Sequence, residues 1–371
     1  MPHARLMTDA QDHAHLGIEP GSVQPWEVGR REDVAPGRSE LWHFEAAMDD
    51  GTTTAVAFCL VGPDPDARAS LRTVVNVFVT TPDGRLHQRT VPGSVEVSAV
   101  GTTRCHLPFG PHTAAGDLRT FTVTVDPVDG VGVELSYEAL VAPYRPGGTA
   151  HVALTDDDGG SFHYAVQTVA RCRVTGTVTT DGRAREVAGQ GYHDHQWTDA
   201  DLVESWHHWL WGRFYGERHT VVIYDLVTSE RFGSTRIPIL GVQDATGAVV
   251  VDHRGGVESH VRTERDDLTG KDYPRRSRYV FRDDDRVVEL DLTWTEVLVN
   301  QDIYAAADVA PELGGGRRDR FDELGIKPSY ARYRADGTLT ITDGAGTTTE
   351  HGEMIYELND VGWPDRRAPV D

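Results

Sequence analysis

One window of the sequence concentrates side chains that could do acid–base chemistry. Residues 189–213 read GQGYHDHQWTDADLVESWHHWLWGR and hold four of the 17 histidines and four of the eight tryptophans. If this window is a strand, His193 and His195 lie on one face and Asp194 on the other. An Asp or His proton donor beside aromatic rings is suited to protonating an alkene, because indole faces stabilise the carbocation through cation–π attraction.

The same histidines allow two other interpretations. Two imidazoles on one face of a strand can bind a metal, and Asp199 stands near the offset at which cupins place a carboxylate. The sequence offers no convincing second strand that bears histidine, so we assign no metal ligands, and a metal enzyme that uses His193 and His195 stays open as a third alternative. Alternatively, His193, Asp194 and His195 form a buried hydrogen-bond network beside a tryptophan-rich core. The residues alone leave catalysis and this structural role open.

The elements that must position these residues are short strands. Apolar and polar residues alternate clearly at 119–125, 131–141 and 288–298. Helical periodicity is confined to 199–211 and 317–325. Further strands are expected at 54–61, 73–80, 94–100, 162–178, 219–227, 236–242, 248–253, 278–283, 338–342 and 349–358. Turn signals that contain Asp-Gly occur at 83–84, 129–130, 158–160, 181–182, 336–337 and 343–344 and predict hairpins.

So many short strands predict an all-β protein of antiparallel barrels or sandwiches. The 371 residues exceed one ordinary eight-stranded barrel. We therefore expect an irregular lead-in at 1–38, an N-terminal β domain at 39–188 and a C-terminal β domain at 189–371 that carries the GYHDHQW motif.

Composition and missing motifs exclude several classes of function. The formal net charge of −22 disfavours binding to nucleic acid or to anionic membrane surfaces. The N-terminus lacks the apolar core of a signal peptide, and no stretch is apolar enough to span a bilayer, so a cytoplasmic location is expected. The three cysteines are widely separated and form no redox or zinc motif. Nucleotide-binding, P-loop, nucleophile-elbow and zincin motifs are absent, so no cofactor is expected.

Three segments carry a resemblance to a known family. They are GQGYHDHQW at 189–197, WHHWLWGRF at 206–214 and TVVIYDL at 220–226. Together they resemble the carotenoid 1,2-hydratase (hydroxyneurosporene synthase) superfamily of tandem lipocalin-like β-barrels. Weaker likenesses lie at 40–52, 170–191 and 352–358. The sequence departs from the family pattern at Gln196, where the family usually has Asn, and at Thr198, where it has Gly.

The resemblance implies a fold and a reaction. The hydratases use His, Trp, Tyr and Asp of this region to protonate an isolated alkene, and the matching positions are His195, Trp197, Tyr224 and Asp225. The superfamily also looks to include fungal Diels–Alderases, which need no cofactor and fold a polyene by proximity. The expected fold is therefore two tandem lipocalin-like β domains.

The resulting functional prediction is a cofactor-independent hydratase or cyclase that acts on a hydrophobic polyene, isoprenoid or polyketide. A pericyclic cyclase and a non-catalytic carrier of lipophiles are the alternatives. The sequence indicates neither the substrate nor the oligomeric state. Candidate catalytic residues are Asp225, His195, Tyr224, Asp194 and His193, and candidate substrate-binding residues are Trp197, Trp209, Trp211, Arg213 and Trp42.

Overall fold

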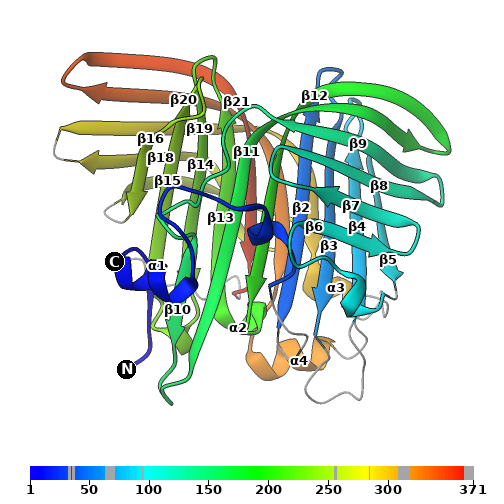
Figure 1. The fold of residues 1–371 in the computed structure, drawn as a ribbon, viewed down its shortest axis with the longest axis horizontal. Helices are drawn as coiled ribbons and strands as arrows, with labels where there is room; N and C mark the ends of the chain where they lie inside the picture. Colours follow the sequence, from blue (N-terminus) through cyan, green and yellow to red (C-terminus); the bar gives the residue numbers. More distant parts are fainter. Residues whose placement is uncertain are drawn as a thin grey trace. The chain divides into compact units, whose positions relative to one another are not determined.

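The computed structural model divides the chain into two compact units. It describes all residues except 32–34, 36–37, 63–71, 94, 255–256, 284, 308–316 and 363–371. We call Met7–Leu154 with Ser161–Leu202 the N-terminal unit. We call Met1–Leu6 with Thr155–Gly160 and Val203–Asp371 the C-terminal unit. Each unit contains an antiparallel sheet that curls around an apolar core (Figure 1).

The sheet of the N-terminal unit runs in the order β5-β4-β3-β2-β12-β11-β9-β8-β7-β6, with β10 paired to β11. Its core is rich in aromatic rings, among them Phe44, Phe58 and Phe121. The strands are β2 (Ser39–Met48), β3 (Thr53–Val61), β4 (Arg72–Thr80), β5 (Leu86–Gly93), β6 (Cys105–Phe109), β7 (His112–Gly116), β8 (Thr120–Val128), β9 (Val131–Ala139), β10 (His151–Thr155), β11 (Ser161–Thr180) and β12 (Arg183–Thr198). The helical segments are α1 (Ala10–Leu16), η1 (Pro25–Val28) and η2 (Val97–Ala99).

The sheet of the C-terminal unit runs in the order β16-β15-β14-β13-β21-β20-β19-β18-β17. Its core holds Phe214, Tyr279, Tyr333 and Tyr356. The strands are β13 (Trp206–Tyr215), β14 (His219–Thr228), β15 (Arg236–Asp244), β16 (Val249–Arg254), β17 (Val257–Arg265), β18 (Asp272–Asp283), β19 (Arg286–Asp302), β20 (Ser329–Asp343) and β21 (Gly346–Asp360), and β1 (His3–Leu6) also falls in this unit. The short helices are α2 (Leu202–Ser205), η3 (Glu230–Phe232), α3 (Ile303–Ala306) and α4 (Arg317–Leu324).

The hairpin predictions are confirmed where both turn residues adopt positive φ. Asp129 and Gly130 have φ of 45° and 77° between β8 and β9, and Asp181 and Gly182 have 50° and 73° between β11 and β12. This backbone twist suits a two-residue hairpin, and Asp and Gly tolerate it best. The all-β prediction is thus confirmed, and α4 matches the helix expected at 317–325.

Three local predictions are wrong. Residues 97–99 form the short 3-10 helix η2 rather than part of a strand at 94–100. Residue 94 lies outside the described residues. Residues 336–337 lie inside β20 instead of forming a turn. The helix expected at 199–211 shrinks to α2, because residues 206–215 pair as β13 with β14 and β21.

The division of the chain also differs from the predicted domains. Strand β12 pairs with β2 and β11, so the motif at 189–197 belongs to the N-terminal unit rather than to a domain that starts at 189. The lead-in contains β1, α1 and η1, which the sequence did not predict. No helix in the described part of the chain has both the length and the apolar character needed to cross a bilayer.

Candidate functional site

The motif strand β12 lies between β2 and β11 (Figure 1), and its alternation separates the motif residues onto two faces. In its register with β2, His193 lies opposite Phe44, Asp194 opposite His43 and His195 opposite Trp42. Phe44 and Trp42 belong to the apolar core. His193 and His195 therefore point into the N-terminal unit's interior, and Asp194 points to the opposite face of the sheet.

His195 is fully buried and both of its ring nitrogens are engaged. Its Nδ1 lies 2.8 Å from the backbone oxygen of Glu27, and its Nε2 lies 2.7 Å from Oε1 of Glu40. A carbonyl oxygen only accepts, so Nδ1 carries a proton and donates it. The contact to Glu40 then contains one further proton, held by an imidazolium or by the carboxyl group. The ring of Trp42 stacks on His195 at 4.6 Å.

The backbone oxygen that holds His195 is itself fixed by a buried ion pair. Arg145 donates to both carboxylate oxygens of Glu27, at 2.7 and 2.6 Å. The same guanidinium donates to the backbone oxygens of Glu19 and Ser22. A bidentate pair of this kind gives geometric precision as well as energy. The N-terminal segment that contains η1 is thereby held against the interior next to His195.

His193 is packed between apolar rings. Its ring centroid lies 4.3 Å from the centroids of both Phe44 and Phe121. Burial lowers its pKa to about 3, despite the opposing effects of Asp194 and of a hydrogen bond to the His43 backbone. The neutral ring donates from Nδ1 to the backbone oxygen of His43 at 2.9 Å. Its Nε2 has no partner within the described residues. His193 thus fixes the backbone of the strand opposite Asp194.

On the other face of β12, Asp194 is almost fully buried and forms a polar chain. The side-chain amide of Gln196 donates to its Oδ1 at 2.9 Å, and Tyr164 donates to Oε1 of Gln196 at 2.8 Å. Oδ2 lies 3.8 Å from Nδ1 of His43, too far for a hydrogen bond. Burial raises the pKa of Tyr164 well above its usual value, so its hydroxyl stays a donor.

Trp197 continues the inner face of β12 and is partly exposed. Its ring lies 5.1 Å from the rings of both His195 and His151. The structure therefore brings Trp42, His195 and Trp197 into one aromatic cluster. Asp194 lies across the sheet from that cluster.

In the C-terminal unit, β13 and β14 also divide their candidate residues between two faces. Leu210 and Phe214 of β13 belong to the core, so Trp209, Trp211 and Arg213 lie on the opposite face. Tyr224 pairs with Trp211 in register and shares this outer face. Trp211, Arg213 and Tyr224 are buried, whereas Trp209 is partly exposed.

A buried acid lies next to Trp211 on this outer face. Glu357 of β21 is opposite Trp211 in register. Its Oε1 accepts from the hydroxyl of Tyr330 at 2.7 Å and lies 3.3 Å from Nε of Arg332, which is almost fully buried. The guanidinium of Arg213 lies 4.2 Å from the centroid of the Tyr215 ring. This face therefore combines two arginines and one carboxylate with aromatic side chains.

Asp225 points into the interior of the C-terminal unit, as Val221 and Ile223 on the same strand do. Both of its oxygens accept hydrogen bonds from Arg236, at 2.7 and 2.8 Å. Arg236 also donates to the hydroxyl of Ser259. A bidentate pair of this kind fixes the orientation of the carboxylate and occupies both of its oxygens.

Further polar groups lie in the same interior. The hydroxyls of Tyr279 and Tyr356 are 3.0 Å apart, and burial is the first cause that raises the pKa of both tyrosines above the usual range. His207 and His208 approach through their Nδ1 atoms at 2.9 Å. Burial and the neighbouring His207 lower the pKa of His208 to about 4. The sequence predicted none of these roles.

The histidines of the motif do not form a metal site with other described residues. Within the described residues, no group of three or more His, Cys, Asp or Glu side chains converges as a metal site would require. His193 donates from one nitrogen, and His195 uses both. The pair of imidazoles that suggested a cupin-like site is thus part of the core network.

Comparison with solved structures gives strong matches over nearly the whole chain. A Nitrosomonas europaea protein provisionally assigned as AttH matches with a TM-score of 0.61 and 14% identity, over 92% of this chain and 98% of the other. CghA in complex with Sch210972 matches with a TM-score of 0.60 and 16% identity, over 90% of both chains. Kievitone hydratase from Nectria haematococca matches with a TM-score of 0.55 and 12% identity, over 99% of this chain and 100% of the other.

The chain has the tandem lipocalin-like β fold of these proteins. The fold predicted from the resemblance is therefore confirmed. No family model matches the sequence. No curated protein matches it either.

Sequence reasoning missed most partners of the candidate residues. Tyr164 was not singled out, and Gln196 was noted only as a departure from the family pattern. His43 and Glu40 of β2 were not among the candidate residues either. The signal that could have found Glu40 is its spacing from Trp42 and Phe44 on β2, which places it on the inner face with them.

Proposed function

We propose that this chain is an enzyme that protonates an alkene of a hydrophobic small molecule and thereby hydrates or cyclises it, without a cofactor. The fold supports this proposal, because one protein that shares it is named a hydratase and another was solved with the small molecule Sch210972. The observation that carries the proposal is the buried carboxyl group of Asp194, which lies on the motif strand and is held by an amide rather than by a guanidinium.

Asp194 is the proposed proton donor. Gln196 fixes Oδ1, and Tyr164 fixes the orientation of Gln196 by donating to its amide oxygen. Oδ2 lies 3.8 Å from Nδ1 of His43 and forms no hydrogen bond with it, so Oδ2 is the oxygen that carries the proton in this proposal. Protonated Asp194 gives its proton to one alkene carbon, and the neighbouring carbon becomes a cation.

The carbocation is then consumed in one of two ways. In hydration, water adds to the cation and loses a proton to the Asp194 carboxylate. In cyclisation, a second double bond attacks the cation, and the new cation loses a proton to the same carboxylate. Either route regenerates the acid.

The other candidate residues take supporting roles in this proposal. Asp225 is paired through both carboxylate oxygens with Arg236, so neither oxygen is open to a substrate in this proposal. His193 and His195 are positioning residues, because His193 fixes the backbone of His43 and His195 fixes the inner face of β12. Tyr224, Trp209, Trp211 and Arg213 lie on the outer face of the C-terminal unit's sheet and take no part in the proton transfer proposed here. Trp42 and Trp197 form the aromatic wall around His195.

The test uses a panel of prenylated phenols and linear polyenes incubated in deuterium oxide. Product mass and carbon-bound deuterium are measured by mass spectrometry. Hydration adds the mass of one water, cyclisation leaves the mass unchanged apart from deuterium, and both place deuterium on carbon. Asp194→Asn should lower turnover by roughly 10²–10⁴-fold. The matched control Asp126→Asn changes an exposed aspartate of the same unit and should leave turnover unchanged.

Other outcomes would contradict the proposal. Ring closure without carbon-bound deuterium would indicate a pericyclic cyclase, which works by preorganisation and does not transfer a proton. Retention of a ligand that is never converted would indicate a carrier. If Asp225→Asn abolished deuterium incorporation and Asp194→Asn did not, the proton donor would be assigned to the wrong unit.

A further inference from the structure

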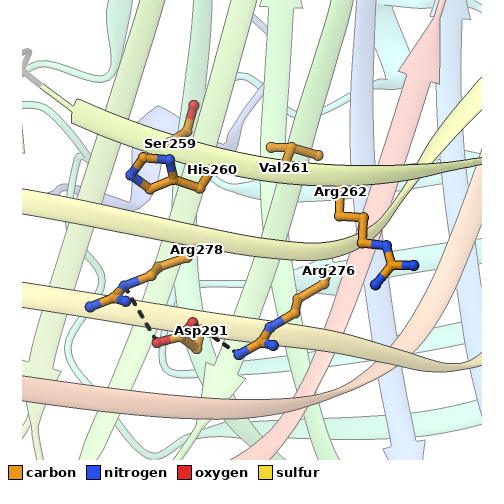
Figure 2. Close-up of a pocket in the computed structure, with 7 residues that line it drawn as sticks. All are labelled: Ser259, His260, Val261, Arg262, Arg276, Arg278 and Asp291. Atoms are coloured by element: carbon orange, nitrogen blue, oxygen red, sulfur yellow. Dashed lines mark ion pairs between the residues drawn. The ribbon is translucent and has the colours of Figure 1, made fainter.

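A groove on the sheet of the C-terminal unit is lined by an unusual number of basic side chains. It has a volume of about 660 Å³ and lies over β17, β18 and β19. Figure 2 shows that Arg276 and Arg278 flank Asp291, with Arg262 and His260 beside them. The chain as a whole carries a formal charge of −22, so this local excess of basic groups runs against its composition.

The basic residues face one another across the strands. The register of β17 with β18 sets Arg262 opposite Arg276 and His260 opposite Arg278. Like charges directly opposite one another destabilise a sheet. Asp291 offsets part of the repulsion, at 4.0 Å from Arg276 and 3.8 Å from Arg278, and Glu289 pairs with Arg278 at 2.7 Å. Arg262 and His260 form no ion pair within the described residues.

The strand that carries these two residues is an edge strand. β17 is the last strand of its sheet, and its only neighbour in the described sheet order is β18. One row of its backbone N–H and C=O groups therefore faces away from the sheet. Val261, between His260 and Arg262, leaves 43% of its surface exposed. Protection of the edge against aggregation explains charges on β17, and ion pairs with β19 explain Arg278, whereas Arg276 has only a 4.0 Å contact with Asp291 among the described residues.

We propose that this groove and the edge of β17 bind an extended acidic segment of a partner protein, which adds to the sheet as a further strand. Alternate side chains of such a segment share one face with a spacing of about 7 Å, which is also the spacing between His260 and Arg262. Carboxylates at alternate positions would thus meet both residues, and guanidinium groups of β18 would reach the same carboxylates.

Other occupants fit the groove less well. Antiparallel pairing of β17 with a second copy, centred on Val261, would set His260 opposite Arg262 and repeat the repulsion. A small anion would compete with water and salt at side chains as exposed as Arg276, whose side chain is 66% accessible. An extended segment adds several such weak contacts along its length. This proposal does not depend on the proposed reaction.

The test measures binding of a labelled synthetic peptide in which glutamate alternates with valine, by fluorescence anisotropy. The full chain should bind it with an affinity that falls as salt rises. A protein with both Arg262→Gln and Arg276→Gln should bind about tenfold more weakly. The control Arg173→Gln removes an arginine of similar exposure in the other unit and should bind as the unchanged protein does.

Two further probes decide between strand addition and a simple charge effect. A peptide with glutamine in place of glutamate should lose most of its affinity. A peptide with proline in place of valine keeps its charge but cannot pair as a strand, and it should also bind weakly. Equal binding of the proline peptide, full competition by inorganic phosphate, an unchanged affinity in the double variant, or no binding at all would each overturn the proposal.

Discussion

The buried histidine His193 predicts a specific loss of stability in mild acid. Burial holds its pKa at about 3 in the folded chain, whereas an unfolded histidine titrates near 6.5. Above about pH 6.5 both states are neutral and the stability does not depend on this group. Below that pH, His193 binds a proton in the unfolded chain but stays neutral in the folded chain. The free energy of unfolding therefore falls as the pH falls towards 3.

The magnitude follows from the two pKa values. Between pH 7 and pH 5 the unfolded histidine gains about 2 kcal/mol from protonation, and the folded one gains almost nothing. Any folded-state pKa below about 4 gives nearly the same result, because pH 5 then still lies above it. His151 and His208, whose pKa values burial also lowers to about 4, act in the same direction.

Urea unfolding at pH 7 and pH 5 measures this contribution in unchanged protein and in His193→Phe. The variant loses the hydrogen bond to the backbone of His43, so it is expected to be less stable at pH 7. Its stability should nevertheless fall by about 2 kcal/mol less than that of the unchanged protein between the two pH values. The control His106→Gln changes an exposed histidine and should preserve the full dependence. Identical pH dependence in His193→Phe and unchanged protein would refute a neutral, buried His193.

Two further substitutions test how the structure is held together. Arg145→Leu should lower the free energy of unfolding by about 3–5 kcal/mol, because it leaves the buried carboxylate of Glu27 without its partner. Urea titration measures this loss. A loss below about 1 kcal/mol would show that the ion pair is not desolvated. Gly337→Ala should lower the free energy of unfolding by about 1–3 kcal/mol and also lower the melting temperature, because the new Cβ would lie 2.6 Å from the ring of fully buried Phe214. An unchanged melting temperature would mean that this ring can move aside.

Most strands could be predicted because alternation and turn chemistry agree along the sequence. The failures occurred where tertiary contacts outweigh local signals. The Asp-Gly pair at 336–337 looks like a turn, but Gly337 is needed inside β20 because the Phe214 ring packs over it. The segment at 199–211 fits a helical period, yet its residues from Trp206 onward gain two strand partners in the sheet, which suits aromatic residues.

The candidate site was predictable in its strands but not in its partners. Alternation alone separates His193 and His195 from Asp194, and the structure has this arrangement. The contact of His195 with Glu40 joins residues 155 positions apart in the sequence. The contact of Arg145 with Glu27 joins residues 118 positions apart. Such contacts depend on sheet order and register, which one sequence does not reveal.

The comparison of Asp194 with Asp225 shows why environment must decide a catalytic role. Both are nearly buried aspartates on strands that match the family motifs. Arg236 engages both oxygens of Asp225, so a proton there would have to displace a guanidinium. Asp194 is held through one oxygen by Gln196, whose amide donates to the carboxyl group in either protonation state. Asp194 therefore fits the proposed role of acid and then base better than Asp225, because no guanidinium engages both of its oxygens.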